Sequence, residues 1–189
     1  VPPDAFTGEI TVCDERGAVR YLACDSSAAY AQAGWRVVRH LVMLGERALV
    51  VFDDIEAPVS GGPGEVVSWF QCGAPTQGLA GGRGIRVCGR QSELLMRFHG
   101  PRDCRVNRLP ERTLHDTHWG YHFAACRWFP VTVTYRAEAP LLTVIAVGGA
   151  APEVSCRTRA SSARFAVAAG PDLSVAFERH GDGWTMEWR

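Results

Sequence analysis

Apolar side chains recur at every second position along much of this chain, and this alternation constrains the fold more than any other feature. The clearest alternating sets are Leu94, Met96 and Phe98; Val131, Val133 and Tyr135; Leu173, Val175 and Phe177; and Trp184, Met186 and Trp188. A period of two places one face of a β-strand in a core and the other face in solvent or in a groove. The sequence therefore predicts strands as the main element.

Short glycine-containing segments separate these runs and indicate hairpins. Gly181-Asp182-Gly183 is expected to join the last two strands, and residues 15–17 the first two, because glycine reaches positive φ without a steric penalty. Many short strands without intervening helices are typical of an antiparallel sandwich. We expect an all-β, supersandwich-like antiparallel β-sandwich with little or no helix, formed as one domain by residues 1–189.

Residues 26–44 allow two interpretations. Residues 26–33 are rich in alanine and could form a helical turn. Residues 35–44 and 48–55 are β-branched and continuously apolar, which favours central strands with Gly45 near the turn between them. The alternative is one helix over residues 26–44.

Charge and cysteine usage narrow the class of protein. The chain has 20 basic and 20 acidic residues, so it lacks the basic excess of a nucleic-acid-binding protein. No apolar run is long enough for a membrane-spanning helix, and we expect no membrane partner.

The seven cysteines form no Cys-x-x-Cys pair, and several lie in apolar runs. They are expected to be mostly reduced, buried thiols, which favours a reducing, cytoplasmic compartment. The alternative is that one or two disulfides form.

The most unusual stretch, residues 114–122, is rich in histidine and aromatic residues. It contains His115, Asp116, His118, Trp119, Tyr121 and His122. Imidazoles and a carboxylate can bind zinc. Alternatively, the aromatic faces can cover the C–H patches of a sugar while the polar groups bind its hydroxyls. A third interpretation is a polar loop whose aromatic residues pack on the sandwich, and all three remain open.

Acidic residues elsewhere are expected to be structural. Asp53 and Asp54 are neighbours on a predicted strand and point to opposite faces, so they do not form a pair of catalytic carboxylates. One of the two carboxylates is expected to be buried against an arginine such as Arg39. Asp25, which precedes two serines, predicts a turn in which its carboxylate accepts a local backbone hydrogen bond.

Six stretches, in order along the chain, resemble motifs of the heparinase II/III-like family of polysaccharide lyases. They are residues 24–30 (CDSSAAY), 39–44 (RHLVML), 49–57 (LVVFDDIEA), 69–71 (WFQ), 119–121 (WGY) and 141–145 (LLTVI). Most of the matching positions are hydrophobic. Gln71 and Cys72 stand where many members carry a leucine and a histidine, so no role of that histidine transfers.

The resemblance implies a fold and an activity for a larger parent protein. Members of the family consist of an α/α toroid followed by an antiparallel β-sandwich, and they cleave uronic-acid-containing polysaccharides by β-elimination. Their catalytic Tyr and His come largely from the toroid, and zinc ligands, where present, precede the first of these motifs. The chain is thus expected to be a C-terminal β-sandwich without catalytic residues, metal ligands or a cofactor of its own, although the parent could bind zinc.

The same resemblance assigns partners and positions. The expected partners are an upstream toroid domain and an acidic polysaccharide or oligosaccharide, and the family implies a periplasmic or secreted location. The structural positions that transfer are Asp25, Tyr30, Arg39 and Asp53, and the candidate sugar contacts are His115, His118, Trp119, Tyr121 and His122. One alternative is a non-catalytic carbohydrate-binding module. Another is a complete small barrel enzyme that uses Asp116, His118 and His122.

Overall fold

The computed structural model describes most of the chain as strands in three antiparallel sheets, with one 3-10 helix. The described residues are 8–58, 64–101, 103–114, 126–148, 151–159, 162–180 and 183–189. The predicted all-β sandwich with little helix is therefore confirmed. Among the described residues, no helix is long and apolar enough to cross a bilayer.

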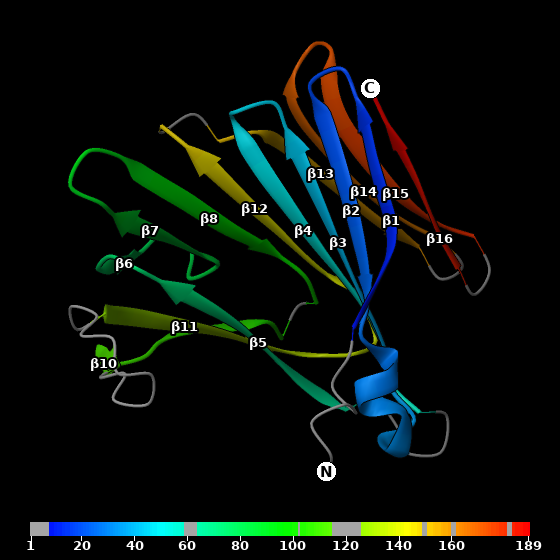
Figure 1. Cartoon of the computed structure of the whole chain (residues 1–189), viewed down its shortest axis with the longest axis horizontal. Coiled ribbons are helices and arrows are strands. Elements are labelled where there is room, and N and C mark those ends of the chain that lie inside the picture. The colour runs from blue at the N-terminus through cyan, green and yellow to red at the C-terminus, as the bar shows by residue number, and fades with distance from the viewer. Residues whose placement is uncertain are drawn as a thin grey trace, which may run out of the picture.

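The largest sheet has eight strands (Figure 1). Their order across the sheet is β1 (Glu9–Arg16), β2 (Val19–Asp25), β3 (Arg36–Leu44), β4 (Ala48–Glu56), β12 (Leu141–Val147), β8 (Glu93–His99), β7 (Gly84–Cys88) and β6 (Thr76–Gly78). The first four strands are consecutive, whereas β12 comes from much later in the chain and pairs with both β4 and β8. β12 therefore joins the two halves of this sheet.

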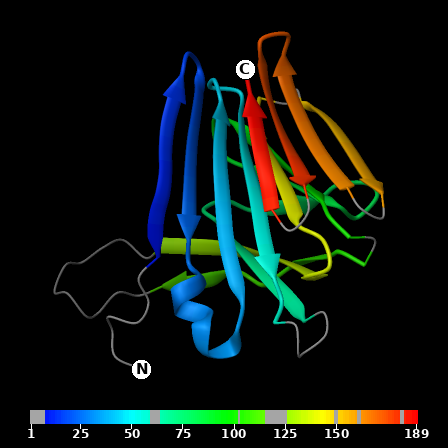
Figure 2. The same cartoon turned by 90° about the vertical axis from the view of Figure 1, so that its right-hand side faces the viewer.

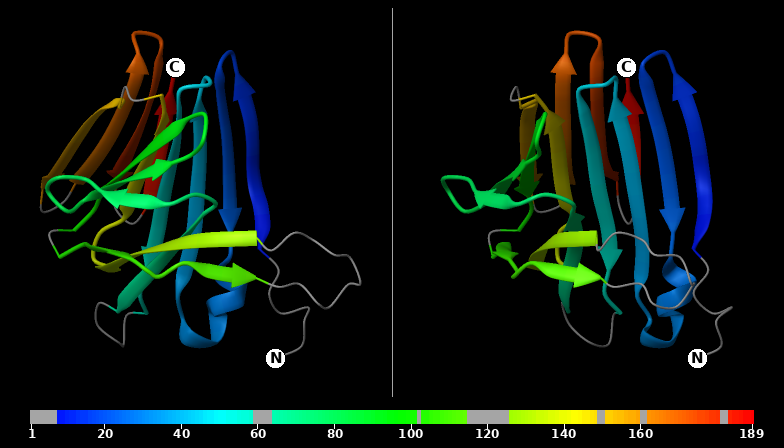
Figure 3. Two further views of the ribbon diagram at one scale, coloured as in Figure 1. Left: turned by 90° about the vertical axis from the view of Figure 1, so that its left-hand side faces the viewer. Right: turned by 60° about the vertical axis from the view of Figure 1, so that its left-hand side comes forward.

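Two four-stranded sheets complete the fold. One contains β10 (Arg112–Leu114), β11 (Cys126–Arg136), β5 (Glu65–Cys72) and β9 (Arg105–Arg108), and the other contains β13 (Glu153–Arg159), β14 (Ser162–Gly170), β15 (Leu173–His180) and β16 (Gly183–Trp188). Figure 3 shows β11 running across the direction of β1–β4, and Figure 2 shows β13–β16 alongside them.

Residues 26–44, for which the sequence allowed two interpretations, form a short helix followed by a strand. The 3-10 helix η2 spans Ser27–Ala33 and ends at Gly34, whose φ of 71° is left-handed. β3 and β4 follow, and Gly45 at the turn between them has a φ of 58°. The predicted helical turn and central strands are confirmed, and the alternative of one helix over residues 26–44 is wrong.

Both terminal hairpins form where glycine predicts them. Arg16 pairs with Val19 across a turn at Gly17, which has a φ of 59°. At the other end His180 pairs with Gly183, while residues 181–182 lie outside the described part of the chain.

The first core lies between the β1–β4 half of the large sheet and the β13–β16 sheet. Its buried side chains are Val19, Tyr21, Ala23, Val42, Leu44, Ala48, Val50, Phe52, Leu142, Val144, Phe165, Val167, Val175 and Phe177. The rings of Phe52 and Phe177 stack with centroids 4.2 Å apart and join the two sheets. Such aromatic contacts add to the burial of apolar area that stabilises a sandwich.

The second core lies on the opposite face of the large sheet. Its members are Cys72, Ile85, Val87, Met96, Phe98, Val131, Val133, Tyr135 and Leu141. Along β12, Leu142 and Val144 belong to the first core, whereas Leu141 belongs to the second. Because successive residues of a strand point to opposite faces, the two smaller sheets cover opposite sides of the large one.

The cysteines only partly match the expectation of buried thiols. The six whose side chains the structure describes are all free, but Cys72 is the one buried member, and Cys13 and Cys156 are exposed. The expectation of burial is wrong for these two: Cys13 lies on the side of β1 that points away from the first core, and Cys156 lies on β13 at the edge of its sheet.

Candidate functional site

A cleft of about 600 Å³ opens where η2 and the ends of β2, β3 and β4 approach the start of β5. Figures 1 and 2 show η2 at the end of the molecule where β5 begins. The lining residues are Cys24, Ser26, Tyr30, Ala33, Trp35, Val37, Arg39, Asp53, Ile55, Glu65, Val66, Val67, Ser68 and Trp69. Three of the four positions taken from the family resemblance, Tyr30, Arg39 and Asp53, therefore lie in one cleft.

Two exposed aromatic side chains line this cleft. Tyr30 is 51% exposed and Trp69 is 47% exposed. Along β5, Ser68 is buried and Phe70 half-buried, so strand alternation turns Trp69 to the outer side. Exposed aromatic rings beside a cleft can contact the C–H face of a sugar or an apolar protein surface.

Trp35 is held by a close contact with the backbone of Gly64. A Cβ atom added to Gly64 would lie 2.4 Å from two atoms of the Trp35 ring. Any larger residue at position 64 would displace this ring, so glycine at that position fixes the shape of the cleft wall.

The polar floor of the cleft is an ion pair between adjacent strands. Arg39 and Asp53 face each other across β3 and β4, and the guanidinium donates from Nε to Oδ1 at 2.6 Å and from Nη2 to Oδ2 at 3.0 Å. Ser68 on β5 donates a third hydrogen bond to Asp53 Oδ2 at 3.1 Å. Asp53 is 2% exposed, so the prediction that one of the two adjacent carboxylates is buried against Arg39 is confirmed, and Asp53 is that carboxylate.

These contacts set the charge states around the floor. Burial opposes the charge of Arg39, but the hydrogen bonds and negative charge of Asp53 outweigh it and raise the pKa of Arg39. Burial and the nearby Asp53 charge raise the pKa of the Tyr135 hydroxyl far above its ordinary value. The floor is thus a neutralised ion pair beside a protonated phenol.

The wall near η2 depends on Asp25. Its Oδ1 accepts a hydrogen bond from the Ser27 amide at 2.8 Å, which is the predicted turn, and Ser27 Oγ accepts one from the Val37 amide at 3.0 Å. The side-chain and backbone hydrogen bonds of Ser27 lower the pKa of Asp25. Asp25 therefore ties the end of β2 to the start of η2, and Ser27 ties the start of η2 to β3.

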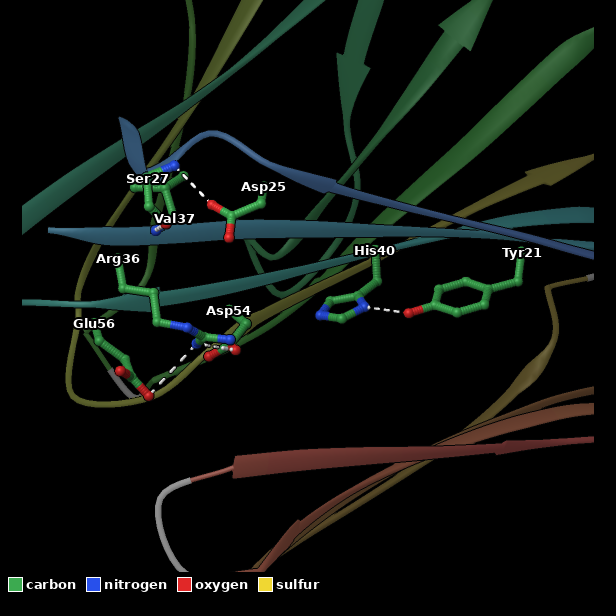
Figure 4. A network of polar contacts seen from close by, with 8 residues as sticks. All are labelled: Tyr21, Asp25, Ser27, Arg36, Val37, His40, Asp54 and Glu56. Carbon is green, nitrogen blue, oxygen red and sulfur yellow. Dashed lines mark hydrogen bonds and ion pairs between the residues drawn. The ribbon is translucent and has the colours of Figure 1, made fainter. Parts of the chain in front are cut away.

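A second polar group lies on the first-core face of the same strands (Figure 4). Arg36 Nη1 donates to Asp54 Oδ2 at 2.5 Å and lies 3.6 Å from Glu56 Oε1. Nearby, the Tyr21 hydroxyl and His40 Nδ1 are 2.9 Å apart. Burial lowers the pKa of His40, so this ring is neutral around neutral pH. Asp53 and Asp54 point to opposite faces, as predicted, and the structure pairs them with different arginines.

The predicted sugar contacts of the histidine-rich segment are not among the residues that line this cleft and that the structure describes. Residues 115–125, which include His115, His118, Trp119, Tyr121 and His122, lie outside the described residues. They connect β10 to β11, which pair with Leu114 opposite Cys126. Within the ranges that the structure describes, no three His, Cys, Asp or Glu side chains are grouped so as to hold a metal ion.

The sequence predicted a buried carboxylate paired with an arginine such as Arg39, but it did not predict the cleft. Alternation predicts that Trp69 points away from Ser68, yet nothing local to β5 shows that η2 lies beside it. The proximity arises from the crossing of the β5 sheet over the large sheet, which depends on contacts distant in sequence.

Together these elements define a class of protein: an all-β sandwich domain in which three antiparallel sheets enclose two cores, with an aromatic cleft at one end. Solved structures narrow the class further. The fold is similar to a heparinase III structure with a TM-score of 0.66 at 11% identity, over 91% of this chain and 28% of that one. It is also similar to the heparan sulfate lyase HepC from Pedobacter heparinus, with a TM-score of 0.63 at 10% identity, over 96% of this chain and 28% of that one.

A further heparinase III structure gives a TM-score of 0.61 at 11% identity, over 96% of this chain and 27% of that one. The resemblance indicated by the sequence motifs is thus confirmed at the level of the fold. The chain spans about a quarter of the length of these lyases. Neither protein-family models nor curated protein sequences give a match.

Proposed function

We propose that this chain is the β-sandwich domain of a heparinase-like polysaccharide lyase and that it supports a separate catalytic domain. The observation that carries the proposal is the similarity of nearly the whole chain to one part of several heparinase III structures. The parent reaction would be β-elimination in a uronic-acid-containing polysaccharide, with catalytic groups supplied by an upstream toroid.

The chemistry of the cleft supports a structural role for this chain, with the catalytic groups in a separate domain. β-Elimination needs a base that removes the proton next to the uronate carboxylate and a group that neutralises this carboxylate. In the cleft, Arg39 is already neutralised by Asp53, and Asp53 is itself held by two donor residues. Neither residue is free to serve as the base or the carboxylate-binding group.

An assay of two proteins tests the proposed role. The isolated chain and the product of the full reading frame that encodes it are incubated with heparan sulfate, and the ultraviolet absorbance of the unsaturated uronate product is followed. We expect no product from the isolated chain and steady product formation by the longer protein. Robust lyase activity of the isolated chain would refute the supporting role.

A second candidate is a non-catalytic carbohydrate-binding module, and the exposed rings of Tyr30 and Trp69 favour it. Saccharide binding by the isolated chain is measured by calorimetric titration with heparan sulfate and neutral oligosaccharides. Under this candidate, Trp69→Ala weakens binding about 3- to 10-fold. The control Val147→Ala, at an exposed position of β12, leaves binding unchanged. A chain that binds saccharide while the longer protein cleaves none would favour the module over the lyase domain.

The predicted sugar contacts of the histidine-rich segment are tested in the same titration. If His115, His118, Trp119, Tyr121 and His122 bind the polysaccharide, Trp119→Ala and His118→Ala each weaken binding by the isolated chain. Unchanged affinity in both variants would leave Tyr30 and Trp69 as the favoured contacts.

A further inference from the structure

One side of strands β1–β3 presents an apolar face that no other described strand covers. The other side of these strands forms the first core with the β13–β16 sheet. Cys13 pairs with Leu22, and Leu22 with Leu41, so these three side chains form a row on the side away from that core. We call the set Ile10, Cys13, Leu22, Leu41 and Met43 the open face. In the right panel of Figure 3, the upper parts of β1–β3 have no sheet in front of them.

The open face is unusually apolar for a solvent-facing sheet surface. Ile10 is 62% exposed, Met43 is 42% exposed, Cys13 is exposed, and Leu22 and Leu41 are partly exposed. An antiparallel strand with one solvated side normally alternates apolar and polar residues. Residues 41–44 of β3 (LVML) instead form a continuous apolar run, which is the pattern of a strand segment that is buried on both sides. Among the described strands, the β13–β16 sheet covers only one of these sides. The apolar pattern therefore indicates that a second layer covers the other side.

The charged groups beside the open face already have partners. Glu15 and Arg20 form a 3.2 Å ion pair at one end, and Arg39 is bound to Asp53 at the other. A covering partner therefore needs to supply an apolar surface and little charge. Large exposed apolar patches with a polar rim are typical of protein–protein contact sites.

We propose that the open face docks against another domain of a longer polypeptide that contains this chain. The inference rests on the proposed function. It is supported by the lengths of the similar lyases, in which more than two thirds of the chain lies outside the matched part. It is also supported by the path of the chain: Gly8 lies beside Ser26, at the cleft end of the open face, and β1 starts there.

Two exposed cysteines allow a matched test. Cys13 lies in the open face, whereas Cys156 lies on β13 in the other sheet. The isolated chain and the product of the full reading frame are treated with iodoacetamide, and alkylation of each cysteine is followed by peptide mass spectrometry. We expect Cys13 to react at least about tenfold more slowly in the longer protein than in the isolated chain, while Cys156 reacts equally in both.

Three other results of this experiment would overturn the docking proposal. A longer protein that is an active lyase but alkylates Cys13 as fast as the isolated chain refutes docking and leaves the proposed function intact. A reading frame that encodes no further domain refutes both. Equal protection of Cys13 in the two proteins, together with an isolated chain that sediments as a dimer, assigns the face to a second copy instead.

A pair of substitutions provides an independent measurement. Leu41→Arg places a charge in the open face, and Val147→Arg places the same charge at a position that is 49% exposed on β12. We expect Leu41→Arg to lower the melting temperature of the longer protein by several degrees more than that of the isolated chain. Val147→Arg should affect the two proteins equally. Equal effects of Leu41→Arg on both proteins would contradict docking at this face.

Discussion

At the scale of single residues, the floor of the cleft shows how hydrogen bonds and an ion pair stabilise a buried carboxylate. Asp53 has three hydrogen bonds from two residues, Arg39 and Ser68. A buried charge is costly unless it is paired, and breaking such a pair by removing one partner is strongly destabilising. The ion pair therefore fixes the relative position of β3, β4 and β5 at the cleft.

Replacing Asp53 with Asn tests this role. We expect the free energy of unfolding to fall by about 2 to 3 kcal/mol, at the lower end for broken buried pairs because the Arg39 side chain remains 42% exposed. Urea denaturation measures the loss. Asp14→Asn, which removes the charge of an exposed pair with Arg16, should cost less than about 0.5 kcal/mol. Similar losses in the two variants would show that burial of Asp53 is energetically unimportant.

His40 should make the stability of the sandwich depend on pH. Burial lowers its pKa from the ordinary value of 6.5. Because the unfolded chain then takes up a proton more readily than the folded one, stability falls as the pH drops below about 6.5 and stops falling on this account below the folded-state pKa. In His40→Gln, stability should fall less between about pH 7 and about pH 5.

The control for this prediction is Val147→Ala, which changes an exposed position of β12 without removing an ionisable group. Val147→Ala should leave the pH dependence of the free energy of unfolding unchanged. An identical pH profile for wild type and His40→Gln would mean that His40 binds protons equally in the folded and unfolded states.

At the scale of elements, the turns require glycine because of its backbone conformation, not because a Cβ atom would clash with neighbouring atoms. Gly17 and Gly73 both have no atom within 4 Å of an added Cβ, but only Gly17 of the two has a positive φ, at 59°. Gly17→Ala should therefore cost about 1 kcal/mol, whereas Gly73→Ala should be neutral or slightly stabilising. Thermal unfolding of the two variants checks this difference, and equal melting temperatures would contradict it.

The sequence predicts the individual elements well because their determinants are local. Alternation identifies β8, β11, β15 and β16, and glycine identifies the turns at Gly17 and Gly45. The Asp25 turn follows from a carboxylate placed two residues before an amide. By contrast, the arrangement of the sheets depends on which strand pairs with β4. Nothing in residues 48–56 specifies β12 as that partner, so the cleft and the open face were not predictable from local pattern.

At the scale of the whole molecule, the first core holds two sheets together through aromatic stacking. Phe52 comes from β4 and contacts Phe177 of β15 and Trp184 of β16. Phe52→Ala should lower the free energy of unfolding by about 3 to 5 kcal/mol, since it removes a fully buried ring and leaves a cavity.

The matched aromatic control is Trp69, which is 47% exposed in the cleft. Trp69→Ala should cost less than about 1 kcal/mol of stability, because much of the ring already contacts water. Chemical denaturation of both variants makes the comparison. A large loss in Trp69→Ala would show that the ring is a structural element rather than an available binding surface.

The position of β12 in the chain also affects synthesis. On the ribosome, β1–β4 emerge well before residues 141–147, and the nascent β4 must present an unpaired backbone edge until β12 is made. Exposed strand edges pair readily with other chains. Stalling translation between these segments should therefore yield an aggregation-prone intermediate that depends on chaperones for its solubility.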